Sequence, residues 1–179
     1  MGNAIGMIEL SSIAEGINAA DAMAKAANVE LIHASTICPG KYIVIVHGEV
    51  GAARAAMGAG AAAAGRYIVD ELLIANVDPQ ICPAIMMTAQ PGEIEAVGVM
   101  EYFSVASAIM AADIAAKAAN VRLIEIRIGF AIGGKGFVTL TGDVGSVRAA
   151  VAAATKEEAL LVSKRVIPRP SRQLADKLI

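Results

Sequence analysis

Apolar residues in the first half of the chain follow two spacings, one typical of helices and one typical of strands. The run Tyr42–Val46 is short and uninterrupted, which is typical of a buried strand. Ser12 and Glu15 match a capping box, which predicts that a helix begins there. The residues that recur at three- and four-residue spacing, and so predict the buried face of this helix, are Ile13, Ile17, Ala20 and Ala24. The whole pattern predicts strands at 4–10, 29–37, 41–47 and 72–77 and helices at 12–27 and 50–64.

The same series of elements occurs a second time. Ala4–Glu9 matches Ala96–Glu101, 92 residues later, and Gly48–Val50 matches Gly142–Val144, 94 residues later. The second copy predicts strands at 96–102, 122–128, 136–141 and 160–167 and helices at 105–119 and 144–155. We therefore predict two domains, residues 1–90 and 91–179, in an α/β fold of the α+β kind. Each domain is expected to contain its elements in the order β, α, β, β, α, β.

One loop distinguishes the two copies chemically. In the first copy it reads Thr36, Ile37, Cys38, Pro39, Gly40 and Lys41. Pro39 cannot donate a backbone hydrogen bond and Gly40 tolerates positive φ, so the stretch predicts a turn between two strands. The second copy has Ile132 and Gly133 in place of the cysteine and proline, followed by Gly134 and Lys135. Only the first loop carries a thiol.

Composition excludes several classes of protein. Hydrophobic residues make up 56% of the chain and the mean hydropathy is +0.61, yet no apolar run reaches the ~18 residues that a membrane span needs. The first residues do not resemble a secretory signal, so a cytosolic protein is expected. A net charge of −2, 3% aromatic residues and no Trp argue against nucleic acid as a partner. The high apolar content favours an extensive oligomeric interface.

The individual candidate residues leave more than one interpretation open. Cys38 and Cys82 are far apart in an apparently intracellular chain, so we expect no structural disulfide. On its own, Cys38 is either a metal ligand or a small buried side chain. Cys82 is interpreted as a packing residue, and His33 and His47 as structural or surface residues, because no second ligand stands at a useful spacing. No paired-carboxylate or Ser/His/Asp constellation is found.

The duplicated motifs carry a resemblance to a known family. They are Asp21–Val29 and Gly48–Ala53 in the first half, and Asp113–Val121, Gly142–Gly145 and Val166–Pro170 in the second. Over almost its whole length the chain resembles the tandem-domain shell proteins of bacterial microcompartments, and most closely the propanediol-utilisation type, which shares the stretch from Thr36 to Lys41. The resemblance implies a structural, non-enzymatic homotrimer whose six domains, each an antiparallel sheet with flanking helices, imitate a hexagonal tile. Such tiles pack against other shell proteins in a microcompartment of the bacterial cytoplasm.

The resemblance also implies where the functional residues lie. Cys38 of each subunit is expected to bind one [4Fe–4S] cluster per trimer at a central pore, with backbone N–H groups around Gly40 donating to cluster sulfides. The implied pore-loop residues are Thr36, Ile37, Pro39, Gly40, Ile132, Gly133 and Gly134. The implied tile-edge residues are Lys25, Lys117 and Arg169. The expected role is electron transfer, or delivery of iron–sulfur units, to redox enzymes inside the shell.

Two other functions stay open at this stage. In one, the tile is the same but the pore conducts a metabolite, and Cys38 is a small lining residue without a cluster. In the other, the protein is a thiol or redox enzyme with Cys38 as its nucleophile. Pro39 and the absence of an evident basic partner argue against the enzyme.

Overall fold

The computed structural model describes residues 3–156 and 160–178 and divides the chain into two compact units, residues 1–77 and 78–179. The sequence placed the domain boundary after residue 90, whereas residues 78–90 belong to the second unit. The backbone N–H of Leu123 donates to the side chain of Gln80 over 2.9 Å, and the N–H of Asp78 donates to Asp113 over 2.8 Å. These hydrogen bonds attach the connecting segment to the second unit.

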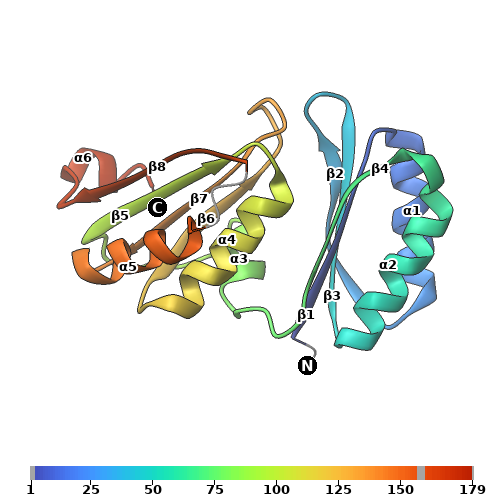
Figure 1. Ribbon diagram of the computed structural model, residues 1–179, viewed down its shortest axis with the longest axis horizontal. Helices are drawn as coiled ribbons and strands as arrows, with labels where there is room; N and C mark the ends of the chain where they lie inside the picture. Colours follow the sequence, from blue (N-terminus) through green and yellow to red (C-terminus); the bar gives the residue numbers. More distant parts are fainter. Residues whose placement is uncertain (1–2, 157–159, 179) are drawn as a thin grey trace. The chain divides into compact units, whose positions relative to one another are not determined.

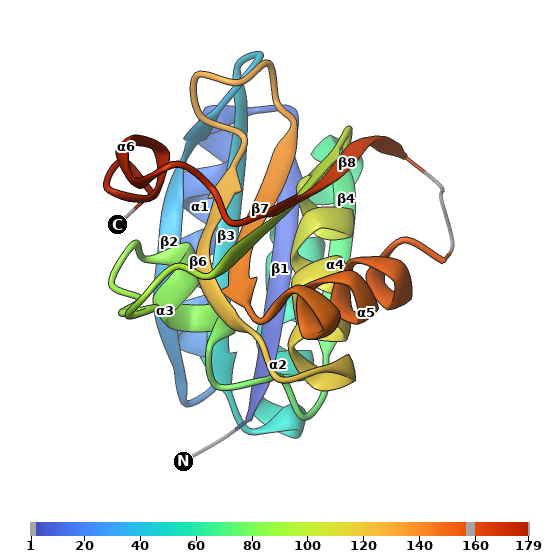
Figure 2. The same ribbon diagram turned by 90° about the vertical axis from the view of Figure 1, so that its left-hand side faces the viewer.

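The first unit is a four-stranded antiparallel sheet covered on one face by two helices (Figures 1 and 2). Its elements are β1 (Ala4–Leu10), α1 (Ile13–Ala26), β2 (Val29–Ile37), β3 (Lys41–Gly48), α2 (Val50–Ala64), η1 (Gly65–Tyr67) and β4 (Ile68–Ile74). The strand order is β2-β3-β1-β4, so β2 and β4 are the edge strands. The last strand begins at Ile68 and ends at Ile74, earlier than the expected 72–77, because Ile68 already pairs with Leu10 of β1.

The second unit repeats this topology with the strand order β6-β7-β5-β8. Its elements are α3 (Ile81–Ile85), β5 (Ala96–Tyr102), α4 (Val105–Ala118), β6 (Arg122–Ile128), β7 (Gly136–Gly142), α5 (Val144–Ala154), β8 (Leu161–Pro168) and α6 (Arg172–Ala175). The predicted duplication and the antiparallel sheets are confirmed. The short helices α3 and α6 were not predicted.

Hydroxyl and carboxylate caps fix where three of the helices begin. Ser12 accepts a hydrogen bond from the N–H of Glu15 over 3.4 Å at the start of α1, which confirms the expected helix start. Ser104 accepts from the N–H of Ser107 over 3.3 Å at the start of α4. Asp143 caps α5, and hydrogen bonds from the Ser146 side chain and backbone hold the pKa of its carboxyl below the usual value.

The buried face of α1 differs from the predicted one. Its buried residues are Gly16, Ala19, Ala20 and Met23. Ile13 and Ile17 are 41% and 56% exposed, so the prediction was right for Ala20 and wrong for these two isoleucines; Ala24 is exposed as well. Small residues face the sheet because α1 lies close to β3, where the ring of Tyr42 fills the space over Gly16. The isoleucines are left on the outer side of the helix.

Gly16 offers a direct test of this close approach. A Cβ atom at this position would stand 2.4 Å from the Tyr42 side chain, a distance that forces the helix or the ring to move. We expect Gly16→Ala to lower the free energy of unfolding by about 1–3 kcal/mol despite alanine's better helix propensity. Gly58→Ala on α2, where an added Cβ meets nothing within 4 Å, should instead raise it by up to about 1 kcal/mol. Urea unfolding of both variants measures the difference, and shifts of the same sign would contradict the packing described here.

Candidate functional site

The thiol of Cys38 lies at the tip of the β2–β3 hairpin. The two strands stay paired as far as Ile37 opposite Lys41, so that only three residues form the turn, with a cis peptide bond between Cys38 and Pro39. The N–H of Gly40 donates to the carbonyl of Ile37 over 3.1 Å, and Gly40 has a φ of +81°. The predicted turn is confirmed, but the N–H of Gly40 is already used within it and is not available to a cluster sulfide.

Exposure along this loop presents the thiol to other molecules. Cys38 is half-buried, Pro39 and Gly40 are exposed, and Thr36 on the preceding strand is exposed as well. Ile37 is buried and anchors the end of β2. A half-buried thiol at the tip of a tight turn can reach a ligand without a rearrangement of the strands beneath it.

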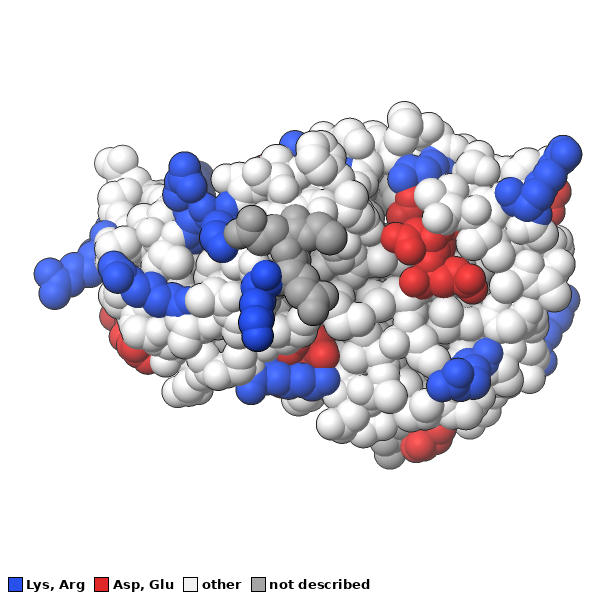
Figure 3. All heavy atoms as spheres, viewed as in Figure 1, with Lys and Arg blue, Asp and Glu red and all other residues white. Residues whose placement is uncertain are grey.

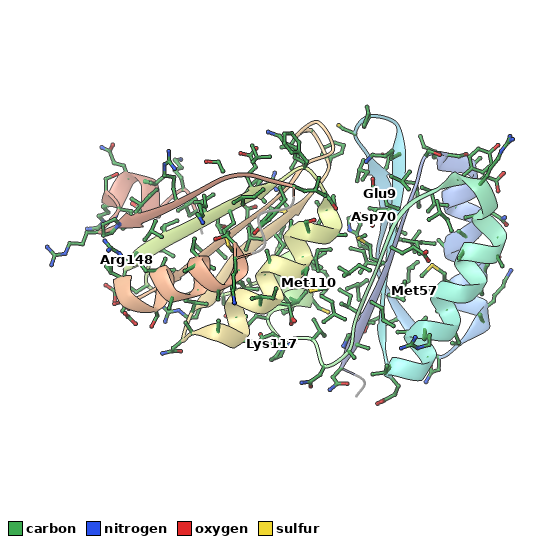
Figure 4. The ribbon with its side chains drawn as sticks, viewed as in Figure 1. Glu9, Met57, Asp70, Met110, Lys117 and Arg148 are labelled. Carbon is green, nitrogen blue, oxygen red and sulfur yellow. The ribbon has the colours of Figure 1, made fainter. Side chains whose placement is uncertain are left out.

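An ion pair fixes the stem of the hairpin. Lys41, the first residue of β3, pairs with Glu9 of β1, and their side chains are 22% and 3% exposed. A buried carboxylate is costly unless it is paired, so this contact ties the residue after the turn to the central strand. Asp70 of β4 is the register partner of Glu9, and Figure 4 labels the two on neighbouring strands. The sequence analysis missed Glu9.

The second hairpin has the same stem and a different tip. Lys135 pairs with Glu101 of β5, which repeats the contact between Lys41 and Glu9. The recurrence of this Glu and Lys in both copies is the sequence signal by which Glu9 could have been found. The loop between β6 and β7 is longer, and Ala131, Gly133 and Gly134 all have positive φ. Ile132 is half-buried and Gly134 buried, whereas Phe130 is 66% exposed.

The sequence offers Cys82 and two histidines as further candidate ligands. Cys82 is half-buried on α3, in the other unit. His33 shares a 2.7 Å hydrogen bond with the hydroxyl of Ser35, and burial lowers the pKa of its imidazole. Within residues 3–156 and 160–178, no group of three or more His, Cys, Asp or Glu side chains is placed to hold a metal ion. Among the described residues, Cys38 is therefore not part of such a group.

The lysines expected at a tile edge occupy equivalent places at the ends of α1 and α4. Lys25 pairs with Asp21 over 2.5 Å, with both side chains exposed. Lys117 pairs over 2.6 Å with Asp113, whose carboxylate is buried and also accepts from the N–H of Asp78 (Figure 4). Arg169, just after β8, is exposed with a φ of +52°.

None of the described helices is both long enough and apolar enough to cross a membrane.

Comparison with known proteins places this architecture in a family. The family model for the BMC domain matches residues 4–77 and again residues 96–170, which correspond to the two sheets and their helices. The bacterial microcompartment shell protein PduT of Citrobacter freundii is 43% identical over 182 residues, covering 100% of this chain and 99% of that protein. The shell protein PduA of the same organism is 47% identical over 77 residues, covering 43% of this chain and 81% of PduA.

A solved structure agrees with these sequence relatives. The crystal structure of a microcompartment protein from Desulfitobacterium hafniense has a TM-score of 0.93 and 49% identity to this chain. The match covers 97% of this chain and 98% of that one. With two BMC domains and a shell protein similar to it over its full length, this chain belongs to the BMC-domain family and is a tandem-domain shell protein of bacterial microcompartments.

Proposed function

We propose that three copies of this shell protein surround a threefold axis and that Cys38 of each copy binds a [4Fe–4S] cluster there. The observation that supports this proposal is the position of Cys38. Its half-buried thiol lies at the tip of a hairpin whose stem is held by a buried ion pair. Among the described residues of its own chain, Cys38 belongs to no group of three or more His, Cys, Asp or Glu side chains that could hold a metal ion. A rotation axis supplies the missing thiols without any change in the fold.

The residues at the loops fit such a group. Iron–sulfur clusters are bound by cysteine thiolates, and Cys38 is half-buried beside the exposed Pro39 and Gly40. Three thiolates leave one iron open to a small ligand or a visiting partner. Gly133 and Gly134 carry no side chain, which would leave room for the second copy's loops beside the axis of the proposed trimer. Thr36, Ile37 and Ile132 complete the proposed pore loops.

The proposed role follows from a cluster in the wall of a shell. When bound, the cluster supplies one-electron transfer across the tile, or serves as an iron–sulfur unit for delivery, to redox enzymes inside. The chain's own residues hold it in place: Lys41 and Glu9 fix the hairpin stem, and Cys38 provides the thiolate. Lys25, Lys117 and Arg169 are proposed to contact the neighbouring tiles, because all three are at the surface and Lys25 and Lys117 occupy equivalent places at the ends of α1 and α4.

The test is anaerobic purification of the full chain with iron and acid-labile sulfide measured per trimer. We expect about four irons and four sulfides per trimer, with a visible charge-transfer band and an EPR signal in one oxidation state. A colourless, iron-free trimer after anaerobic reconstitution with iron and sulfide would overturn the proposal. The remaining function would then be a tile whose pore conducts a small metabolite.

A further inference from the structure

A second candidate site lies in the second unit, between α5 and β8. The cleft has a volume of about 250 Å³, and its lining residues are Arg148, Val151, Ala152, Lys164, Arg165 and Val166. Half of them are cationic and half are small apolar side chains. Figure 3 shows Lys and Arg side chains grouped over this side of the second unit, and Figure 4 labels Arg148 on α5.

The contacts within the cleft hold positive charge in place. The ammonium of Lys164 donates to the hydroxyl of Thr155 over 2.9 Å, and that hydroxyl donates to the carbonyl of Val151 over 2.7 Å. The guanidinium of Arg165 donates to the backbone carbonyl of Lys164 over 2.8 Å. None of the ion pairs among the described residues includes Arg148 or Arg165. The guanidinium groups of Arg148 and Arg165 carry like charges, and an anion bound between them would offset their repulsion.

The duplicated fold shows that this charge is not required by the architecture. β8 pairs with β5 in the register with which β4 pairs with β1, and this register makes Lys164 the counterpart of Glu71. The helix position is basic in both copies, with Arg54 on α2 matching Arg148 on α5. The first copy thus places an acidic residue where the second places a lysine. In the second copy, cations stand on both the helix and the strand that form the walls of the cleft.

We propose that this cleft binds a small organic phosphate, a phosphate ester with a compact apolar part. Guanidinium groups bind phosphate oxygens through paired, charge-assisted hydrogen bonds, and Arg148 and Arg165 stand on the two elements that form the walls. Val151, Ala152 and Val166 supply the apolar surface for the organic part. A volume of about 250 Å³ suits a small molecule of this kind and is too small for a folded peptide segment. The site is independent of Cys38 and of any cluster there.

The probe is phenyl phosphate, titrated calorimetrically into the full-length protein in its native assembly state, with inorganic phosphate alongside. We expect one site per chain, weaker binding of inorganic phosphate, and loss of affinity as salt is raised. Arg148→Gln and Arg165→Gln should each weaken phenyl phosphate by roughly ten-fold or more. Arg54→Gln, at the matching helix position of the first copy, should leave the affinity unchanged.

Three outcomes would overturn this site. One is the absence of saturable phenyl phosphate binding, and another is an equal loss of affinity in Arg54→Gln, which would indicate a general effect of surface charge. The third is tighter binding of a glutamate-rich peptide than of phenyl phosphate, which would make the cleft a protein contact. Circular dichroism and the assembly state of each variant show whether a loss of binding comes from a loss of fold.

Discussion

Cys38→Ser is expected to remove the iron and sulfide from the protein and to leave its assembly state and unfolding temperature close to those of the wild type. The thiol lies at the tip of a turn, outside the buried core, and the stem of the hairpin is held by Lys41 and Glu9 instead. A serine hydroxyl is a poor ligand for iron at neutral pH, because thiolates are what these clusters require. Iron analysis, the visible spectrum and light scattering of the same preparation provide the readouts.

Cys82→Ser is the matched control for this experiment. Cys82 is also half-buried, but it lies on α3 in the other unit, so its replacement should leave the iron content unchanged. If iron were lost equally from both variants, the two cysteines would act together and a site built on Cys38 alone would be wrong. If Cys38→Ser also dissociated the protein, the separation between scaffold and metal site would fail.

Ile17→Glu is expected to convert the assembled protein into monomers. Ile13 and Ile17 form an exposed apolar pair one turn apart on α1, 41% and 56% exposed. Their counterparts in the second copy, Val105 and Ile109, are 0% exposed. The first copy therefore leaves uncovered a helix face that the second copy buries, and another copy of the chain is the partner that the proposed assembly provides. A carboxylate placed in such a contact loses its hydration without gaining a partner.

The measurement is light scattering of Ile17→Glu beside Ile17→Leu and Ala62→Glu. Ile17→Leu keeps the apolar surface and should stay assembled. Ala62→Glu adds the same charge at an exposed position of α2 and should also stay assembled. Circular dichroism of Ile17→Glu should match that of the wild type, since the side chain is outside the core. An assembled Ile17→Glu protein would show that this face of α1 is not part of the interface.

Most of the fold could be predicted from the sequence, because the duplication repeats the pattern of each helix and strand. The capping serine before α1, the turn at Pro39 and Gly40 and the uninterrupted strand at Tyr42 were all located correctly. The buried face of α1 was not, because apolar spacing alone ranks two isoleucines above a glycine and an alanine. In this close-packed layer the small residues face the sheet. The short helices α3 and α6 carry too few residues for a periodic signal.

The candidate site was predictable only where it depends on local sequence. The loop that carries Cys38 was evident from the difference between the two copies. The partner of its neighbouring lysine was not, because Glu9 is 32 residues away along the chain and meets Lys41 only through the pairing of β1 with β3. The cleft between α5 and β8 was missed for the same reason, since Arg148 and Arg165 lie on different elements.

Each hairpin consists of a stem that is held by a Lys–Glu ion pair and a tip that differs between the copies. The ion pairs are Lys41 with Glu9 in the first copy and Lys135 with Glu101 in the second. The stem has the same pair of residue types in both copies, whereas the tip is a three-residue turn with a thiol in one and a longer glycine-rich loop in the other. Duplication of such a domain lets one tip acquire new chemistry while both copies keep the same sheet topology. In this way a few residues at the tip of a hairpin can change the chemistry of the loop, with the sheet and helices beneath it left as they were.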